Sequence, residues 1–322
     1  MKNDKMDFTN HDHNNNINNW ERGILEKLLL EVYKVQQRTR MWRWVWRIFW
    51  IFLLLIIISG IFGTKSEVKI RENHTAVIDL SGVIDSETNQ ADVLHEGLEN
   101  AYKAKNVKGI IIRANSPGGS PVISSIAYQE IRNMKAKNPN IPVYVVIEDM
   151  CASGCYYIAS AADKIYADQS SLVGSIGVIG SSFDFTGLIE KLGIKRRVKI
   201  AGNNKDMGDP FVPETPEQQQ IWKQMLSSIH NQFINAVKQG RGNRLKYTEN
   251  PDVFSGRAYT GEEGKAVGLI DDYGNIYTIS RDVIKAPVLV NYTPDNKWSK
   301  LLGRHLSSEL QHNIQGMMQR PW

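Results

Sequence analysis

Short apolar runs alternate with amphipathic stretches through the middle of this chain. Runs rich in valine and isoleucine, the pattern of strands covered on both faces, occupy residues 75–84, 107–116, 142–149 and 164–168. Between them, apolar residues recur at helical spacing over residues 91–105 and 123–137. Strands that alternate with helices of this length predict βαβ units and a mostly parallel sheet, and so an α/β fold.

A different pattern, apolar on every side, precedes this region. Residues 48–64 carry no charged side chain, and as a helix they would span roughly 25 Å, slightly less than the ~30 Å hydrocarbon core of a bilayer. Aromatic and basic side chains at its start can form an interfacial belt (Trp42, Arg43, Trp44, Trp46, Arg47, Trp50). A soluble helix is not expected to be apolar all round, and a leader of 47 residues without a following Ala-x-Ala site disfavours a cleaved signal peptide. We therefore predict a single uncleaved transmembrane helix over residues 42–64.

The flanks of this anchor set its orientation. Five basic residues and no acidic residue lie between Lys34 and Arg47, whereas the charges that follow the anchor are mixed. The positive-inside rule then keeps the N-terminus in the cytoplasm and places the rest outside the cytoplasmic membrane. The predicted organisation is a disordered cytoplasmic head, an amphipathic juxtamembrane helix, the anchor, an extracytoplasmic domain and a helical tail (residues 1–19, 20–41, 42–64, 65–285 and 286–322).

Charge and histidine content exclude some functions. The 39 lysines and arginines exceed the 34 acidic residues by only five, and they are spread along the chain, so we predict no nucleic-acid partner. His11 and His13 lie in the polar head, where a solvated tail explains them better than a metal site does. We predict neither a metal nor a cofactor.

Two cysteines, Cys151 and Cys155, lie four residues apart. This number excludes a disulfide scaffold, and the spacing is not a Cys-x-x-Cys motif. Residues four apart on a helical turn can approach closely enough to oxidise, but the geometry is usually poor. We expect two small, buried, reduced side chains.

Two loops at the ends of neighbouring predicted strands carry candidate chemistry. The first, Ser116 to Gly119, has paired glycines whose backbone N–H groups can point into a cleft, although a tight turn explains them equally well. The second places Ser153 before Gly154 at the start of a predicted helix. A serine there is often only an N-cap, but it can also be a nucleophile beside a free N–H group. Both interpretations stay open at this point.

A serine nucleophile needs a base. The histidines beyond the anchor are His74, His95, His230, His305 and His312, and none adjoins a glycine-rich or turn motif. A lysine can serve instead if an apolar site lowers its pKa. Lys205, in a Gly/Asn-rich loop after the predicted strand 196–200, is the candidate, although a lysine in such a loop is ordinarily exposed.

Five ordered segments decide between these alternatives: NSPGGS, MCASGCYYIASAADKIYA, LVGSIGVIG, AGNNKDMGDPF and GRAYTGEEGKAVGLID. Together they resemble the bacterial signal peptide peptidase A family in its short, single-repeat form. That resemblance covers about residues 75–285 and implies a crotonase/ClpP-like fold and a membrane-anchored serine endopeptidase. It further implies cleaved signal peptides as hydrophobic substrates, and a homo-oligomeric ring in which neighbouring protomers contribute serine and lysine.

Carried over by position, the resemblance assigns five residues. Ser153 would be the nucleophile and Lys205 the general base, while Gly119 and Gly154 would supply the oxyanion N–H groups. Ser175 would hold the lysine amine by a hydrogen bond. The family more often has glycine where this chain has Cys155. A related membrane-protein quality-control peptidase, an inactive crotonase-like scaffold and, least favoured, an acyl-CoA enzyme are the alternatives.

Overall fold

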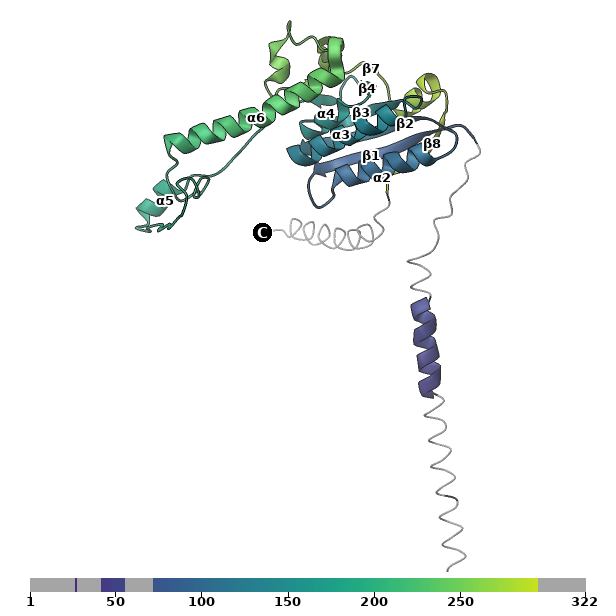
Figure 1. Ribbon diagram of the computed structural model, residues 1–322, viewed down its shortest axis with the longest axis horizontal. Coiled ribbons are helices and arrows are strands. Elements are labelled where there is room, and N and C mark those ends of the chain that lie inside the picture. Colours follow the sequence, from purple (N-terminus) through teal and green to yellow (C-terminus); the bar gives the residue numbers. More distant parts are fainter. Residues whose placement is uncertain (1–26, 28–41, 56–71, 295–322) are drawn as a thin grey trace, which may run out of the picture. The chain divides into compact units, whose positions relative to one another are not determined.

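The computed structural model describes residue 27 and residues 42–55 and 72–294 (Figure 1). The chain divides into two compact units, Met1–Lys69 and Ile70–Trp322. In the first, residues 42–55 form a helix. Among the described residues, no helix is both long enough and apolar enough to cross a membrane. The predicted head, most of the juxtamembrane helix, the second half of the anchor and most of the tail lie outside the described residues.

The second unit is built on a sheet whose described part has eight strands in the order β6-β5-β3-β2-β1-β8, with β4 pairing with β3 and β7. The strands are β1 (His74–Ile84), β2 (Val107–Gly119), β3 (Val143–Ala152), β4 (Lys164–Ala167), β5 (Leu172–Gly174), β6 (Ala258–Thr260), β7 (Asp272–Tyr273) and β8 (Val288–Asn291). All pairings are parallel except that of β5 with β6. The α/β sheet predicted from the sequence is therefore confirmed.

Helices cross between the parallel strands and form the predicted βαβ units. Helix α2 (Gln90–Lys103) connects β1 to β2, and α3 (Pro121–Lys137) connects β2 to β3. The three consecutive isoleucines Ile110, Ile111 and Ile112 are all fully buried. Ile110 and Ile112 belong to the main core with α2 and α3, whereas Ile111 packs with Ile276 and Ile279 in a smaller cluster. Burial on both faces explains why the strand has no polar alternation.

The remaining helices follow β3 along the chain. They are α4 (Gly154–Ala159), α5 (Thr186–Lys191), α6 (Pro216–Arg241), α7 (Gly261–Val267), α8 (Ile276–Thr278), η1 (Gly242–Arg244), η2 (Pro251–Phe254) and η3 (Ile279–Val283). Residues 196–200, which we predicted as a strand, have no strand structure. Their side chains are exposed and no strand in the described part of the chain supplies backbone partners, so the local β-branched pattern alone does not form a strand there.

Helix α6 has 26 residues and so extends for about 39 Å. A capping box between Thr215 and Gln218 fixes its start. Only its C-terminal half packs well on the core, through Phe233, Ala236 and Val237. Its N-terminal half carries the segment with α5 away from the sheet (Figure 1). We call residues 178–226 the arm; α5, which lies within it, has no buried residue.

The base of α6 is fixed by a buried charge cluster. The Arg241 guanidinium, 1% exposed, donates to Asp271 at 2.7 Å, and Arg244 donates to the other oxygen of that carboxylate at 3.0 Å. Burial raises the pKa of the Asp271 carboxyl, but hydrogen bonds and charge from Arg241, with the charge of Arg244, outweigh it and hold that pKa below its usual value. Asp271 therefore stabilises the fold in its charged form.

Asp271→Asn should lower the free energy of unfolding by about 3 kcal/mol at pH 7, because Arg241 stays buried without its carboxylate partner. A depressed folded-state pKa stabilises the fold above the unfolded-state pKa, so the difference between wild type and variant should shrink as the pH falls below about 4. Chemical unfolding of the detergent-solubilised chain at both pH values measures this. Asp282→Asn, the same change in the exposed pair with Arg281, should have little effect. Equal effects of both variants would contradict the prediction.

Candidate active site

Ser153 lies at the sharp turn between β3 and α4. Its backbone has φ 52° and ψ −122°, a conformation that costs a non-glycine residue roughly 1–3 kcal/mol and persists only where the surroundings impose it. The Ser153 N–H donates to the Gly174 carbonyl oxygen at 2.8 Å, and the Ser153 carbonyl accepts from the Tyr157 N–H at 3.0 Å. Its backbone is thus held between β5 and α4.

The Ser153 side chain is not an N-cap. Its hydroxyl makes no capping hydrogen bond with α4, and none to any other residue in the part of the chain that the structure describes. The side chain is partly exposed. A serine held in a strained turn with an unpartnered hydroxyl favours the nucleophile over the N-cap interpretation.

The glycine loop at the end of β2 lies directly against this turn. The buried Ser116 hydroxyl accepts from the Gly118 N–H at 3.1 Å. At Gly118, where φ is 97°, a Cβ atom would lie 2.8 Å from the Ser153 Cβ and 2.7 Å from the Gly154 nitrogen. Only glycine fits there, because any side chain would collide with the serine turn.

Gly119 and Gly154, the two predicted oxyanion donors, lie together. A Cβ atom on Gly154 would be 3.2 Å from the Gly119 nitrogen and 2.5 Å from the Ser124 hydroxyl oxygen. Gly154 is the first residue of α4, so its N–H has no partner within the helix. Two neighbouring backbone N–H groups are the donors that an oxyanion hole needs. The free serine hydroxyl lies beside them.

Ser175 also lies at this site. It follows Gly174, whose carbonyl accepts from Ser153, and its own N–H donates to the Arg257 carbonyl at 2.9 Å. Its φ of 51° is again left-handed. Four of the five predicted site residues, Ser153, Gly119, Gly154 and Ser175, are therefore brought together by the ends of β2, β3 and β5.

Lys205 is not brought to this group within one chain. It is exposed and lies in the arm, where the neighbouring Asp206 accepts from Gln218 near the start of α6 at 2.9 Å. The serine site contacts α6 further along, where a ring nitrogen of His230 lies 2.9 Å from the Ile176 carbonyl. The 12 residues from Gln218 to His230 correspond to about 18 Å of helix. The apolar groove expected to desolvate Lys205 is therefore not formed around it by this chain alone.

The three described histidines beyond the anchor have other partners. The ring nitrogens of His74 lie 2.9 Å from the Tyr292 hydroxyl and 3.0 Å from the Glu72 carbonyl, and His95 pairs with Glu130. His230 lies 2.9 Å from the Ile176 carbonyl, one residue after Ser175, and is the member of this set nearest the site. No group of three or more metal-ligating side chains occurs among the described residues.

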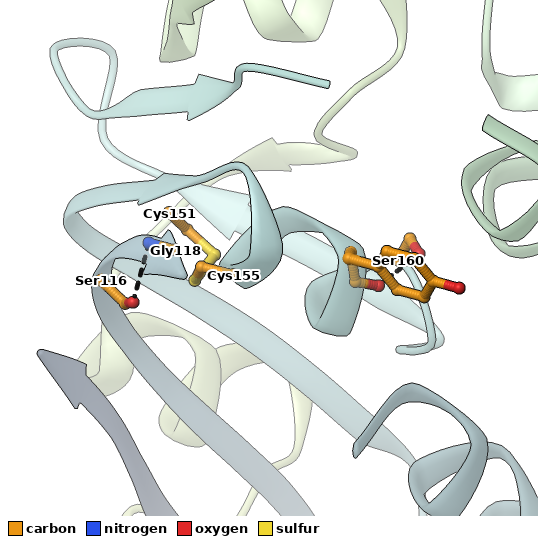
Figure 2. The surroundings of a disulfide bond; sticks show 6 residues. Ser116, Gly118, Cys151, Cys155 and Ser160 are labelled. Atoms are coloured by element: carbon orange, nitrogen blue, oxygen red, sulfur yellow. Dashed lines mark hydrogen bonds between the residues drawn. A yellow bond between two sulfur atoms is a disulfide. The ribbon is translucent and has the colours of Figure 1, made fainter. Parts of the chain in front are cut away.

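The expectation of reduced cysteines was wrong. Cys151 and Cys155 are fully buried, as predicted, but they form a disulfide with a Cα–Cα distance of 5.1 Å. The prediction assumed two positions on one helical turn. Cys151 instead belongs to β3 and Cys155 to the first turn of α4. The sharp bend at Ser153 lies between them, and Figure 2 shows the two cysteine side chains joined across it.

Comparison with known proteins identifies related peptidases. Residues 135–286 match the model of peptidase family S49. A protein of Methanocaldococcus jannaschii, described as a candidate protease, is 32% identical over 229 residues, which cover 69% of this chain and 72% of that protein. A candidate signal peptide peptidase of Enterococcus faecium is 34% identical over 177 residues, 55% of this chain and 50% of that protein.

A further relative, a protein of Brucella melitensis described as a Na⁺/H⁺ antiporter, is 42% identical over 209 residues. These residues are 65% of this chain but only 28% of that protein. The chain therefore matches less than a third of this relative's length, and the antiporter description concerns the whole of that protein.

Proposed function

Because the chain belongs to peptidase family S49, we propose that it is a membrane-anchored serine endopeptidase of crotonase/ClpP-like fold that degrades residual signal peptides at the extracytoplasmic face of the cytoplasmic membrane. The observation that carries this proposal is the free Ser153 hydroxyl on a left-handed turn, packed against the Gly118–Gly119 loop and followed by the first N–H of α4. The likeness to a candidate signal peptide peptidase supports the substrate class.

The proposed mechanism is acyl transfer. The Ser153 oxygen attacks the peptide carbonyl carbon while the neutral Lys205 amine takes the hydroxyl proton. The Gly119 and Gly154 N–H groups stabilise the resulting oxyanion. Collapse of this intermediate breaks the C–N bond, and the Lys205 ammonium returns the proton to the leaving amine. Water, deprotonated by Lys205, then hydrolyses the acyl-enzyme and regenerates Ser153.

The base comes from a neighbouring protomer in this proposal. Lys205 lies on the arm, about three turns of α6 away from the point where the serine site contacts that helix. The arm also exposes many large apolar side chains (Ile179, Phe183, Leu188, Leu192, Ile194, Val198, Ile200, Phe211, Met225). Such a surface is unusual on a monomer and suits burial against another copy of this chain. We therefore propose a homo-oligomeric ring in which each arm brings Lys205 beside the next protomer's Ser153.

The proposed location rests on the predicted anchor and its flanks. The apolar run of residues 48–64 and the basic cluster before it support a peptidase domain outside the cytoplasm. The Cys151–Cys155 disulfide supports this location, because disulfides persist mainly in oxidising compartments. The lipid bilayer is then a partner of the chain and also the source of its hydrophobic substrates.

A reporter enzyme that is active only outside the cytoplasm should work when fused after Ile200 and fail when fused after Gln36. The expected cause is the basic flank, which keeps Gln36 on the cytoplasmic side. Reporter activity normalised to fusion-protein abundance measures this. The reverse pattern would contradict the orientation and the proposed access to signal peptides.

The proposed substrate class is tested with detergent-extracted full-length protein. A synthetic signal peptide should be cleaved, and a polar peptide of equal length should be cleaved much more slowly. A fluorophosphonate probe should label one serine, identified as Ser153 by peptide mass spectrometry. Preference for a segment of an intact membrane protein would instead favour a quality-control peptidase. Failure to label Ser153 would favour an inactive scaffold.

A further inference from the structure

We propose that the Cys151–Cys155 disulfide is a clasp that positions Ser153 and the Gly154 N–H for catalysis. This inference rests on the proposed peptidase function. The bond closes a loop of five residues with Ser153 at its centre. One end belongs to the sheet and the other to the first turn of α4, so the clasp connects the two elements whose junction carries the nucleophile.

The turn needs such a restraint because its conformation is intrinsically unfavourable. Ser153 has a positive φ, which a non-glycine residue leaves readily unless its surroundings prevent it. Its side chain contributes no capping hydrogen bond. The two backbone hydrogen bonds, to Gly174 and from Tyr157, hold the serine nitrogen and carbonyl oxygen. The Gly154 N–H lies in the same peptide plane as the Ser153 carbonyl, so its direction depends on the one hydrogen bond from Tyr157, and this pair of bonds gives it no covalent restraint.

The disulfide supplies the missing restraint from the sheet side. Cys151 pairs in register with Ser116 on β2 and with Val173 on β5, so its Cα is held by strands on both sides. Ser116 in turn accepts from the Gly118 N–H. Figure 2 shows the disulfide beside the Ser116–Gly118 turn. A clasp anchored here therefore fixes α4, and with it Gly154, relative to the glycine loop that carries Gly119.

Complete burial of both sulfurs favours a permanent clasp over a reversible switch. Neither cysteine is accessible to solvent, so a soluble thiol cannot reach the bond while the domain is folded. The bond must then form during folding, when an external disulfide such as oxidised glutathione accepts two electrons and two protons from the two thiols. The reduced protein is accordingly obtained only by folding it under reducing conditions.

The test compares three forms of the full-length chain, each synthesised in detergent micelles. These forms are wild type folded with oxidised glutathione, wild type folded with a phosphine reductant, and Cys151→Ala/Cys155→Ala. Alkylation and mass spectrometry verify the thiol count. The double-alanine variant loses the volume of two sulfur atoms as well as the bond. The reduced wild type is its matched control, because it keeps both sulfur atoms and lacks only their bond. Leu98→Ala, in the buried face of α2, is the control for lower thermal stability without a change at the site.

The reduced and double-alanine forms should lose about tenfold in kcat, with KM changed less than about twofold, because misplacing the nucleophile weakens the transition state more than substrate binding. Fluorophosphonate labelling of Ser153 should slow by a similar factor. Leu98→Ala should keep the wild-type kcat when it is assayed well below its own melting temperature. Unchanged kcat and labelling rates in the reduced form, with only a lower melting temperature, would overturn the clasp and leave a purely structural bond.

Hydrogen exchange separates failure of this inference from failure of the proposed function. Loss of the bond should increase amide exchange in the peptide that spans residues 150–158, whether or not the protein is a peptidase. If the oxidised protein neither cleaves peptide nor reacts with the probe, the proposed function fails and exchange alone tests the clasp. Identical exchange in oxidised and reduced forms would overturn the clasp by itself.

Discussion

Ser153→Ala should reduce kcat/KM for peptide cleavage by roughly 10³-fold or more, because removal of a nucleophile leaves only binding and oxyanion stabilisation. The variant should fold normally, since the serine hydroxyl makes no hydrogen bond within the described chain and alanine fits the same space. A fluorogenic signal-peptide assay in detergent measures the loss, and thermal unfolding tests the fold.

Ser170→Ala is the matched control for this experiment. Ser170 is exposed in the loop before β5, and it contributes to the structure through its backbone N–H, which donates to Asp168. Its activity should equal that of wild type. Retention of near-normal kcat in Ser153→Ala would remove Ser153 from the reaction, and a different nucleophile would then be needed.

Lys205→Ala should be as inactive as Ser153→Ala, and a mixed assembly of the two inactive variants should recover activity. In a ring, an active site forms where a protomer with intact Ser153 adjoins a protomer with intact Lys205. After random mixing at an equal ratio, half of the protomers have an intact Ser153 and the other half have an intact Lys205. About one quarter of the sites then combine the two intact residues, so about one quarter of the wild-type rate should return. Co-expression with two different affinity tags, purification on both, and the peptide assay measure this.

The control for the mixing experiment is Lys137→Ala, exposed at the end of α3 and outside the arm, which should keep wild-type activity alone. Near-normal activity of Lys205→Ala itself would exclude the lysine as the base and direct attention to His230, which lies beside the Ser175 segment. No recovery on mixing, with both single variants inactive, would contradict a site shared between protomers.

The sheet could be predicted from the sequence because its central strands have a pattern with a physical cause. Ile110 to Ile112 and the Val-rich part of β3 are buried on both faces, so no polar residue interrupts them. The glycines of the site were also recognisable, because their close approach excludes any side chain. The prediction of a strand over residues 196–200 was wrong because β-branched residues form a strand only where a neighbouring strand pairs with them.

The geometry of the site was less predictable from the sequence. The disulfide depends on the bend at Ser153, and the spacing of Cys151 and Cys155 alone describes a helical turn that does not exist there. The separation of Lys205 from Ser153 depends on the direction of α6, which arises from tertiary packing at Phe233 and Arg241. Helical periodicity gives the length of such a helix, but it does not give the surface on which the helix ends.

The long reach of α6 has a consequence for when the chain becomes active. In the proposed ring, a single copy has its serine in place but holds its lysine about 18 Å along the helix, and would be latent without a propeptide or an inhibitor. Activity would then depend on encounters between copies in the membrane and would rise more steeply than in proportion to their surface density. Under this proposal, stray proteolysis by isolated copies is avoided, and the amount of protein in the membrane sets the threshold at which degradation begins.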